Sequence, residues 1–203
     1  MTATLGASYF DGMYARSADP WGFTSRWYER RKYAISLAML PRERYRRGFE
    51  PGCSIGVLTA ALADRCDDVV AADVDERAVT TARDSLAPLG NVRVERLSLP
   101  QEWPDGMFDL VVISELAYYL GPAELDQLLD CAVGSLAPRG TLLACHWRHP
   151  VPDYPATGDE VHHRLLARPE LDQAVSHLEE DFRLDLLTLG STPSPARREG
   201  LVA

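Results

Sequence analysis

The stretch Glu50-Pro-Gly-Cys-Ser-Ile-Gly56 decides the fold class, because it places two glycines between a short strand-like run and a helical pattern. We expect a strand at residues 47–50, directly before it. The residues after it form one apolar face of a helix, namely Val57, Leu58, Ala61 and Leu62. Glycine at such a turn lets the backbone approach a ligand at the helix N-terminus. The stretch therefore predicts a ligand-binding turn.

Short apolar runs alternate with helical patterns along the rest of the chain, which is typical of an α/β fold with a mostly parallel sheet. Further strands are predicted at 69–73, 92–96, 108–114, 140–145 and 182–188, with an antiparallel edge strand at 198–203. Helices are predicted at 24–40, from the N-cap Asp75 to 87, at 122–136, and in one or two short pieces within 160–177. Residues 6–23 and 146–158 are expected to be irregular.

Length and composition indicate one globular domain over residues 1–203, with N-terminal lid helices at 1–45 and an α/β core at 46–203. The net charge of −9 disfavours a general nucleic-acid binder. No apolar run is long enough for a membrane span, and no basic segment precedes an apolar stretch at the N-terminus. We therefore expect a cytoplasmic protein. Its four cysteines lack metal or redox spacing and are predicted to be free thiols.

The residues around the glycine turn exclude two phosphate-binding motifs. Counted from Gly52, a dinucleotide fingerprint needs small residues where Ser54 and Val57 stand, and a P-loop needs a lysine that is absent. Glu50 before the turn repels a pyrophosphate but attracts an amino group. Asp73 ends the second strand, 21 residues after Gly52, where an acid accepts hydrogen bonds from ribose hydroxyls. A nucleoside with a cationic amino-acid tail, such as S-adenosylmethionine, has all of these parts. The competing interpretation is a tight turn and a strand end without a ligand.

These motifs make the chain resemble the class I S-adenosylmethionine-dependent methyltransferases. The resemblance rests on Glu50-x-Gly-Cys-Ser-x-Gly56 followed by Asp73-Val-Asp-Glu76. Three further stretches resemble the nodulation protein S type of N-methyltransferase: Asp19-Pro-Trp21, Trp27-Tyr-Glu29 and residues 108–120. The resemblance implies a Rossmann-like fold, with a seven-stranded, mostly parallel sheet, helices on both faces and an N-terminal helical lid.

The resemblance also implies which residues bind the cofactor. The implied set is Gly52, Cys53, Ser54 and Gly56 along the methionine part, Asp73 on the ribose, Val74 and Ser98 beside the adenine, and Ser114 and Trp21. An aromatic ring such as Trp21 is attracted to a sulfonium. Arg31 and Lys32 are candidates to pair with the methionine carboxylate. Two positions depart from the family pattern, since Ser54 stands where glycine is common and Ser98 where aspartate is common.

Methyl transfer from a sulfonium is an in-line displacement, for which the protein aligns the nucleophile and excludes water. Glu115 is the candidate that binds an incoming ammonium and accepts its proton, or else it is a helix-start carboxylate. His146 is a second candidate base, or else a satisfied loop histidine. Tyr118 lines the acceptor pocket or packs in the core. The histidines at 146, 149, 162 and 163 match no standard zinc spacing, so no metal is predicted.

Together these features predict an S-adenosylmethionine-dependent methyltransferase that acts on a small molecule and releases S-adenosylhomocysteine. The resemblance implies N-methylation of an amino sugar or a deacetylated oligosaccharide. The alternatives are an O-methyltransferase acting on a natural-product hydroxyl, and a cofactor-binding module without turnover. No nucleic-acid or membrane partner is expected, and the oligomeric state is left open.

Overall fold

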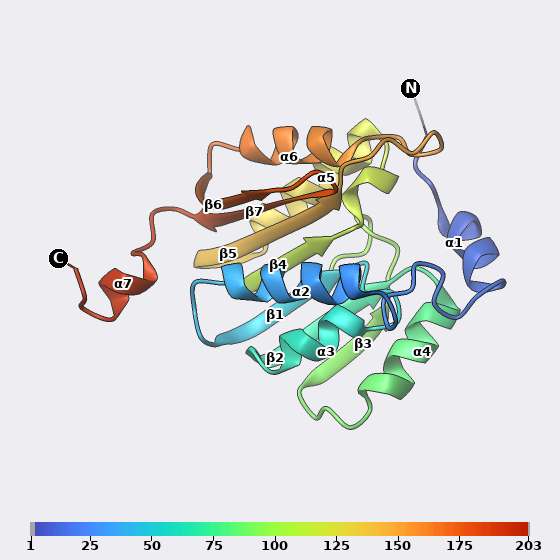
Figure 1. The fold of residues 1–203 in the computed structure, drawn as a ribbon, viewed down its shortest axis with the longest axis horizontal. Helices are drawn as coiled ribbons and strands as arrows, with labels where there is room; N and C mark the ends of the chain where they lie inside the picture. The colour runs from blue at the N-terminus through green and yellow to red at the C-terminus, as the bar shows by residue number, and fades with distance from the viewer. Residues whose placement is uncertain (1–2, 203) are drawn as a thin grey trace.

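The computed structural model describes residues 3–202, whose centre is one seven-stranded sheet (Figure 1). Its strand order is β3-β2-β1-β4-β5-β7-β6, with β1 to β5 parallel and β7 antiparallel to both of its neighbours. The strands are β1 (Tyr45–Pro51), β2 (Cys66–Asp73), β3 (Val92–Arg96), β4 (Phe108–Ser114), β5 (Leu136–Trp147), β6 (Leu171–Leu178) and β7 (Phe182–Leu189). The predicted fold class, a mostly parallel sheet of seven strands, is confirmed.

Helices cover both faces of this sheet (Figure 1). They are α1 (Ala7–Tyr14), α2 (Trp27–Met39), α3 (Val57–Ala63), α4 (Glu76–Leu86), α5 (Pro122–Gly134), α6 (Gly158–Leu166) and α7 (Pro195–Arg198), with a 3-10 turn η1 (Ala117–Tyr119). Alternate residues of β4 serve the two faces, as the strand period requires. Val111 and Ile113 pack in the core with α5 and α6, whereas Leu110 and Val112 pack with α2 and α3. The central strand is therefore buried on both sides.

Three predictions in the outer parts of the chain were wrong. Residues 7–14, expected to be irregular, form α1. The second half of the predicted helical region 160–177 is the edge strand β6, although α6 does end before Pro169. Only three residues separate β6 from β7, so their pairing closes a short loop at little entropic cost. The edge strand expected at 198–203 is absent from residues 198–202, which follow or end α7, and residues 1, 2 and 203 lie outside the described range.

The N-terminal segment lies across the carboxyl edge of the sheet. The Leu5 N–H donates to the Tyr119 carbonyl at 2.9 Å, and the Thr4 hydroxyl accepts from the Gly121 N–H at 2.7 Å. Further along, the Phe10 ring meets that of Tyr119 edge to face at 4.9 Å. This segment therefore forms one wall of the region where α/β sheets bind ligands.

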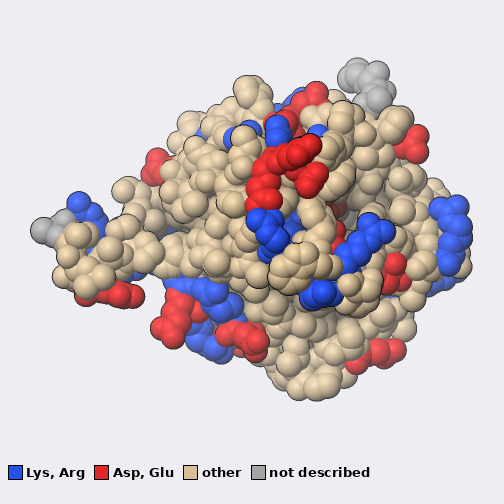
Figure 2. Space-filling view, viewed as in Figure 1, with Lys and Arg blue, Asp and Glu red and all other residues tan. Residues whose placement is uncertain are grey.

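The surface on the face drawn in Figure 2 interleaves basic and acidic side chains. Several of these charges pair between elements, as in Arg31 with Glu179 at 2.8 Å and Arg47 with Asp68 at 3.1 Å. Cys53, Cys66, Cys131 and Cys145 are free, as predicted. Among residues 3–202 no helix has the length and apolar character needed to cross a membrane.

Candidate active site

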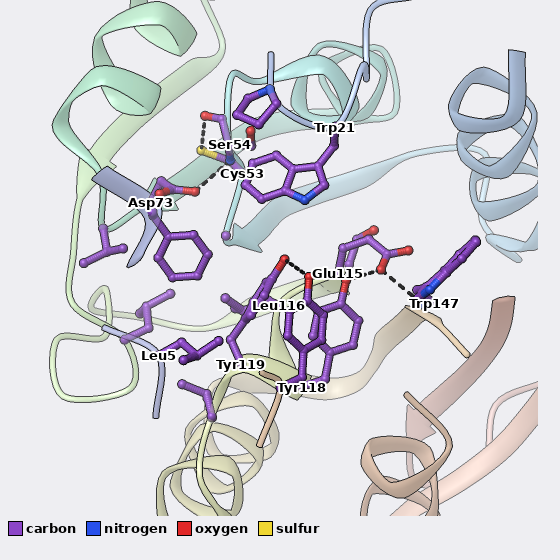
Figure 3. A pocket seen from close by; sticks show the side chains of 18 of the residues that line it. Leu5, Trp21, Cys53, Ser54, Asp73, Glu115, Leu116, Tyr118, Tyr119 and Trp147 are labelled. Carbon is purple, nitrogen blue, oxygen red and sulfur yellow. Dashed lines mark hydrogen bonds between the residues drawn. The ribbon is translucent and has the colours of Figure 1, made fainter. Parts of the chain in front are cut away.

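A cavity of about 630 Å³ opens at the carboxyl ends of β1 to β4, under the N-terminal segment (Figure 3). It brings together most of the residues that the sequence singled out, although they come from distant parts of the chain. The predicted residues that line it are Trp21, Gly52, Cys53, Ser54, Asp73, Val74, Ser98, Ser114, Glu115 and Tyr118. Two predicted residues, Gly56 and His146, are not in its wall.

The turn from β1 into α3 is shaped by backbone hydrogen bonds to β2. The N–H groups of Gly52 and Cys53 both donate to the Ala72 carbonyl, at 2.7 and 2.9 Å. Gly52 has a φ of +76°, and a Cβ there would lie 3.0 Å from a methyl carbon of Leu116. A side chain at this position is strained by the backbone and crowded by its neighbour. Glycine therefore keeps this part of the cavity wall open.

Gly56 serves the packing of two helices and not the cavity wall. It adopts a φ of +83° at the start of α3, and a Cβ there would lie 2.7 Å from Leu86 on α4. The expectation that Gly56 lies along the methionine part of the cofactor is therefore corrected. The glycine allows α3 and α4 to approach each other, and this packing supports the turn between β1 and α3 on the side away from the cavity.

Asp73 is held in place by two backbone amides. Its Oδ2 accepts from the Ser54 N–H at 2.8 Å and its Oδ1 from the Asp75 N–H at 3.0 Å. Burial raises the pKa of Asp73 even though these donors oppose the shift. The carboxylate oxygens retain lone pairs beyond those two bonds. Asp73 is therefore an oriented acceptor at the end of β2, next to Val74 in the cavity wall.

Glu50 is a nearly fully buried carboxyl group in the same region. Burial raises its pKa to about 8, while the Thr59 hydroxyl donates to Oε2 at 2.6 Å and opposes the shift. A buried carboxyl group of this kind gives up its proton more readily when a cation binds beside it. The cavity thus contains an acidic group suited to the amino end of a ligand.

Glu115 lies at the other end of the cavity, at the carboxyl end of β4 (Figure 3). Its carboxylate accepts hydrogen bonds from three donors. Its Oε1 accepts from Lys32 Nζ at 2.7 Å. Its Oε2 accepts from the Trp147 N–H at 3.0 Å and from the Tyr118 hydroxyl. Glu115 also adopts a φ of +54°, which is uncommon for a residue with a side chain. Its position therefore depends on contacts with α2, η1 and β5.

Lys32 and Glu29, on α2, complete this charged group. The Lys32 side chain is 2% exposed, and its Nζ lies 2.9 Å from Glu29 Oε2. Although burial opposes it, the carboxylates of Glu115 and Glu29 raise the pKa of Lys32 above its ordinary value. Burial also raises the pKa of Glu29. Lys32 thus pairs with protein carboxylates, and Arg31 pairs with Glu179 outside the cavity wall.

Sequence reasoning missed Glu29 as a site residue. The signal was present, since Glu29 and Lys32 are one helical turn apart and lie on the same face of α2. Lys32 is also the single lysine of the sequence.

The interpretation of His146 as a base in the cavity is corrected by its position. Its side chain is fully buried within β5, and the cavity wall does not include it. Its Nε2 accepts from the Ala117 N–H at 3.3 Å, and its Nδ1 lies 3.1 Å from His162 Nε2. Burial and the neighbouring His162 lower its pKa well below the ordinary value. The imidazole is therefore not presented to the cavity.

Comparison with known proteins agrees with this geometry. A family model described as a methyltransferase domain matches residues 49–140. The crystal structure of a protein from Pseudomonas syringae, assigned to the methyltransferases, is 51% identical, covers 80% of this chain and 99% of that chain, and has a TM-score of 0.72. The fold and the site thus define a class I methyltransferase, and the chain belongs to the S-adenosylmethionine-dependent methyltransferases.

Within that family, the chain is similar to nodulation protein S. The protein of that name from Rhizobium tropici is 29% identical over 127 residues, which are 62% of this chain and 53% of that protein. The chain thus spans about half the length of this curated relative. The N-methyltransferase NodS from Bradyrhizobium japonicum WM9, solved with S-adenosyl-L-homocysteine, has the same fold, with a TM-score of 0.82 at 23% identity over 91% of this chain and 98% of that chain.

Proposed function

We propose that this chain transfers the methyl group of S-adenosylmethionine to the nitrogen of a small-molecule amine. The observation that carries the proposal is the charged group at one end of the cavity. Two carboxylates, those of Glu29 and Glu115, share one ammonium group, that of Lys32. The cluster retains one net negative charge in a largely buried setting, which favours a cationic ligand.

The other end of the cavity fits the cofactor. The open backbone at Gly52 gives room for the methionine part, and Asp73 presents an oriented acceptor for the ribose hydroxyls. Glu50 is suited to the amino group, while Val74 and Ser98 border the adenine side. Trp21 and Ser114 line the space between the two ends. When bound, S-adenosylmethionine supplies an electrophilic methyl group.

Glu115 and Glu29 have different roles in this proposal. A carboxylate can accept about four hydrogen bonds, and the carboxylate of Glu115 already accepts three. Glu115 therefore orients the acceptor nitrogen with its remaining position. Glu29 Oε2 contacts Lys32 Nζ at 2.9 Å, and burial raises the pKa of Glu29, so we assign Glu29 as the proton acceptor. An amine must lose a proton before it attacks in line, and Glu29 takes that proton.

The acceptor class that we propose is an amino sugar or a deacetylated oligosaccharide. Aromatic side chains line the acceptor end and offer flat surfaces to a sugar ring, namely Tyr28, Tyr118, Trp147 and Tyr154. The similarity to nodulation protein S supports an N-methyltransferase. A hydroxyl acceptor would leave the negative charge of the cluster without a partner.

Replacement of Glu115 by Gln tests the proposal. We expect S-adenosylhomocysteine release with an amino-sugar acceptor to fall by about 100-fold or more, because the substituted amide no longer attracts an ammonium group. The affinity for S-adenosylhomocysteine, measured by calorimetry, is expected to stay within about twofold, since Glu115 lies at the acceptor end. The measurement compares initial rates over a panel of amino sugars and their N-acetylated forms.

Glu124→Gln is the matched control, because Glu124 also lines the cavity but bonds Gln101 and stands outside the charged cluster. Equal losses in the two variants would contradict the role of Glu115. Binding of the cofactor without turnover of any amine would instead support the binding module. Faster turnover of hydroxyl acceptors would support O-methylation.

A further inference from the structure

Behind the cavity, a line of buried polar groups runs from the loop after β4 to the far strand β7. The Ala117 N–H donates to His146 Nε2 at 3.3 Å. His146 Nδ1 lies 3.1 Å from His162 Nε2, and His162 Nδ1 lies 2.7 Å from Asp185 Oδ2. The side chains of His146, His162 and Asp185 have no exposed surface, and none lines the cavity. We call these three residues the histidine relay.

The geometry fixes the direction of every hydrogen bond in the histidine relay. A backbone N–H can only donate, so His146 Nε2 accepts and carries no proton. His146 therefore carries its proton on Nδ1 and donates to His162 Nε2. His162 in turn carries its proton on Nδ1 and donates to Asp185. A second proton on His146, at Nε2, would face the Ala117 N–H. A second proton on His162, at Nε2, would face the proton on His146 Nδ1. Either arrangement would place two donors against each other.

Asp185 is the last residue of the relay and is held in place by further hydrogen bonds. Its Oδ2 also accepts from Arg183 Nε at 2.7 Å, and its Oδ1 accepts from the Gln173 side-chain amide at 2.8 Å. Although burial opposes it, the hydrogen bond from His162 helps to hold the pKa of Asp185 below its ordinary value. The relay thus ties α6, β5 and β7 to one backbone amide of the Ala117 turn.

That amide belongs to the loop that carries the acceptor end of the site. Three consecutive residues of β5 each bond this loop. The Cys145 carbonyl accepts from the Glu115 N–H at 2.9 Å, His146 accepts from Ala117, and the Trp147 N–H donates to Glu115 Oε2 at 3.0 Å. Of these three residues of β5, His146 contributes its side chain, whereas Cys145 and Trp147 contribute backbone groups. Because Glu115 has a left-handed backbone, its carboxylate direction depends on how the next residues are held.

We propose that His146 and His162, anchored by Asp185, are positioning residues that hold the loop of Glu115 and Tyr118, with both imidazoles neutral and protonated on Nδ1. The kinetic part rests on the proposed function, since it concerns turnover of an amine acceptor. The tautomer part does not, because it concerns hydrogen bonds that exist without any ligand.

The tautomers are tested first, in the wild-type chain labelled with ¹⁵N and without added ligand. Long-range ¹H–¹⁵N correlation spectra distinguish the two ring nitrogens of each histidine. We expect two of the five histidines to show a protonated Nδ1 and a bare Nε2. The other three are assigned by the variants His149→Gln, His163→Gln and His177→Gln, which alter side chains outside the buried relay. A protonated Nε2 on either remaining histidine would overturn the proposal, whatever the enzyme turns over.

The positioning role is tested with two replacements of His146. A glutamine oxygen can accept from the Ala117 N–H as Nε2 does, whereas leucine cannot. We expect His146→Leu to lower kcat by about 10- to 100-fold, because the loop shifts relative to the acceptor. His146→Gln is expected to recover most of that loss, and the affinity of both for S-adenosylhomocysteine is expected to stay within about twofold of wild type.

His163→Gln is the control, because His163 follows His162 on α6 but is exposed. Equal losses in the Gln and Leu variants of His146, or no loss in either, would overturn the positioning role. If His146→Leu does not fold, the wild-type tautomers still decide the matter, and a loss of kcat of about 10-fold or more in His146→Gln would overturn the positioning role. If no amine is turned over, the proposed function fails while the tautomer result stands by itself.

Discussion

The two ends of the cavity, which we propose for the cofactor and for the acceptor and call the cofactor end and the acceptor end, are built in different ways. The cofactor end consists of Glu50, the turn that begins at Gly52, and Asp73 with Val74, which lie close together in the sequence and along adjacent strands. The Ser54 amide that orients Asp73 is 19 residues from it. At the acceptor end, Lys32 and Glu115 are in contact although 83 residues separate them. The cofactor end is formed mainly by the conformation of the backbone. The acceptor end is formed mainly by charged side chains.

This difference predicts which end tolerates substitutions. Backbone shape at a glycine turn depends on the absence of a side chain, so almost any substitution alters it. A cluster of charges at the junction of four elements can be rebuilt with other residues while the fold stays the same. We therefore expect the cofactor end to respond to substitutions through binding, and the acceptor end through turnover.

The largest effect that we expect at the cofactor end comes from Gly52→Val. The branched side chain meets Leu116 and is forced into a left-handed backbone, so the affinity for S-adenosylhomocysteine should fall by more than about 100-fold. Calorimetry on the folded variant measures this loss. Gly90→Val is the control, because nothing lies within 4 Å of a Cβ at Gly90. Wild-type affinity in Gly52→Val would show that the cofactor end does not depend on its backbone conformation, and would contradict the proposed difference between the two ends.

The same difference decides how much the sequence could predict. Glycines and an acid at fixed spacing are local signals, and most of the residues that they single out line one cavity in the structure. The strands β3 and β4 were also predicted at their observed bounds, 92–96 and 108–114. Contact between α2 and the loop after β4 is a tertiary event without a local signal. The spacing of Glu29 and Lys32 on α2 was a local signal, but the contact of Lys32 with Glu115 became visible only in the structure.

His146 shows how a small error in a strand end changes an interpretation. The sequence predicted that the strand ends at Cys145, which would place His146 in a loop at the cavity. The strand instead continues to Trp147, because residues 145–147 pair with residues 182–184 of β7. Side chains alternate along a strand, so His146 points into the core beneath α6. The neighbouring Trp147 lines the cavity instead.

Asp73→Ala should have a smaller effect, confined to binding. Loss of a charged hydrogen-bond acceptor for the ribose is expected to weaken S-adenosylhomocysteine binding by about 1–3 kcal/mol. The KM for the amine acceptor should not change if the two ends are independent. Calorimetry and initial rates measure the two quantities.

Asp75→Ala is the control, since Asp75 caps α4 through the amides of Arg77 and Ala78. That variant should lose about 1 kcal/mol of stability and keep its affinity for the cofactor product. Affinity in Asp73→Ala equal to that of wild type would contradict the ribose assignment.

The last effect concerns Glu50, a buried carboxyl group at the cofactor end, and appears as a dependence of stability on pH. Its folded pKa is raised to about 8, so between the ordinary carboxyl range and pH 8 it is protonated when folded and ionised when unfolded. The folded state then binds more protons, and stability falls as pH rises, by about 1.4 kcal/mol per pH unit at most. Glu50→Gln lacks this titration. Its free energy of unfolding, measured in urea, should therefore gain on that of wild type between about pH 5.5 and 8. Parallel curves for the two proteins would show that Glu50 is ionised in the folded state, and would make the cofactor end a site of fixed charge like the acceptor end.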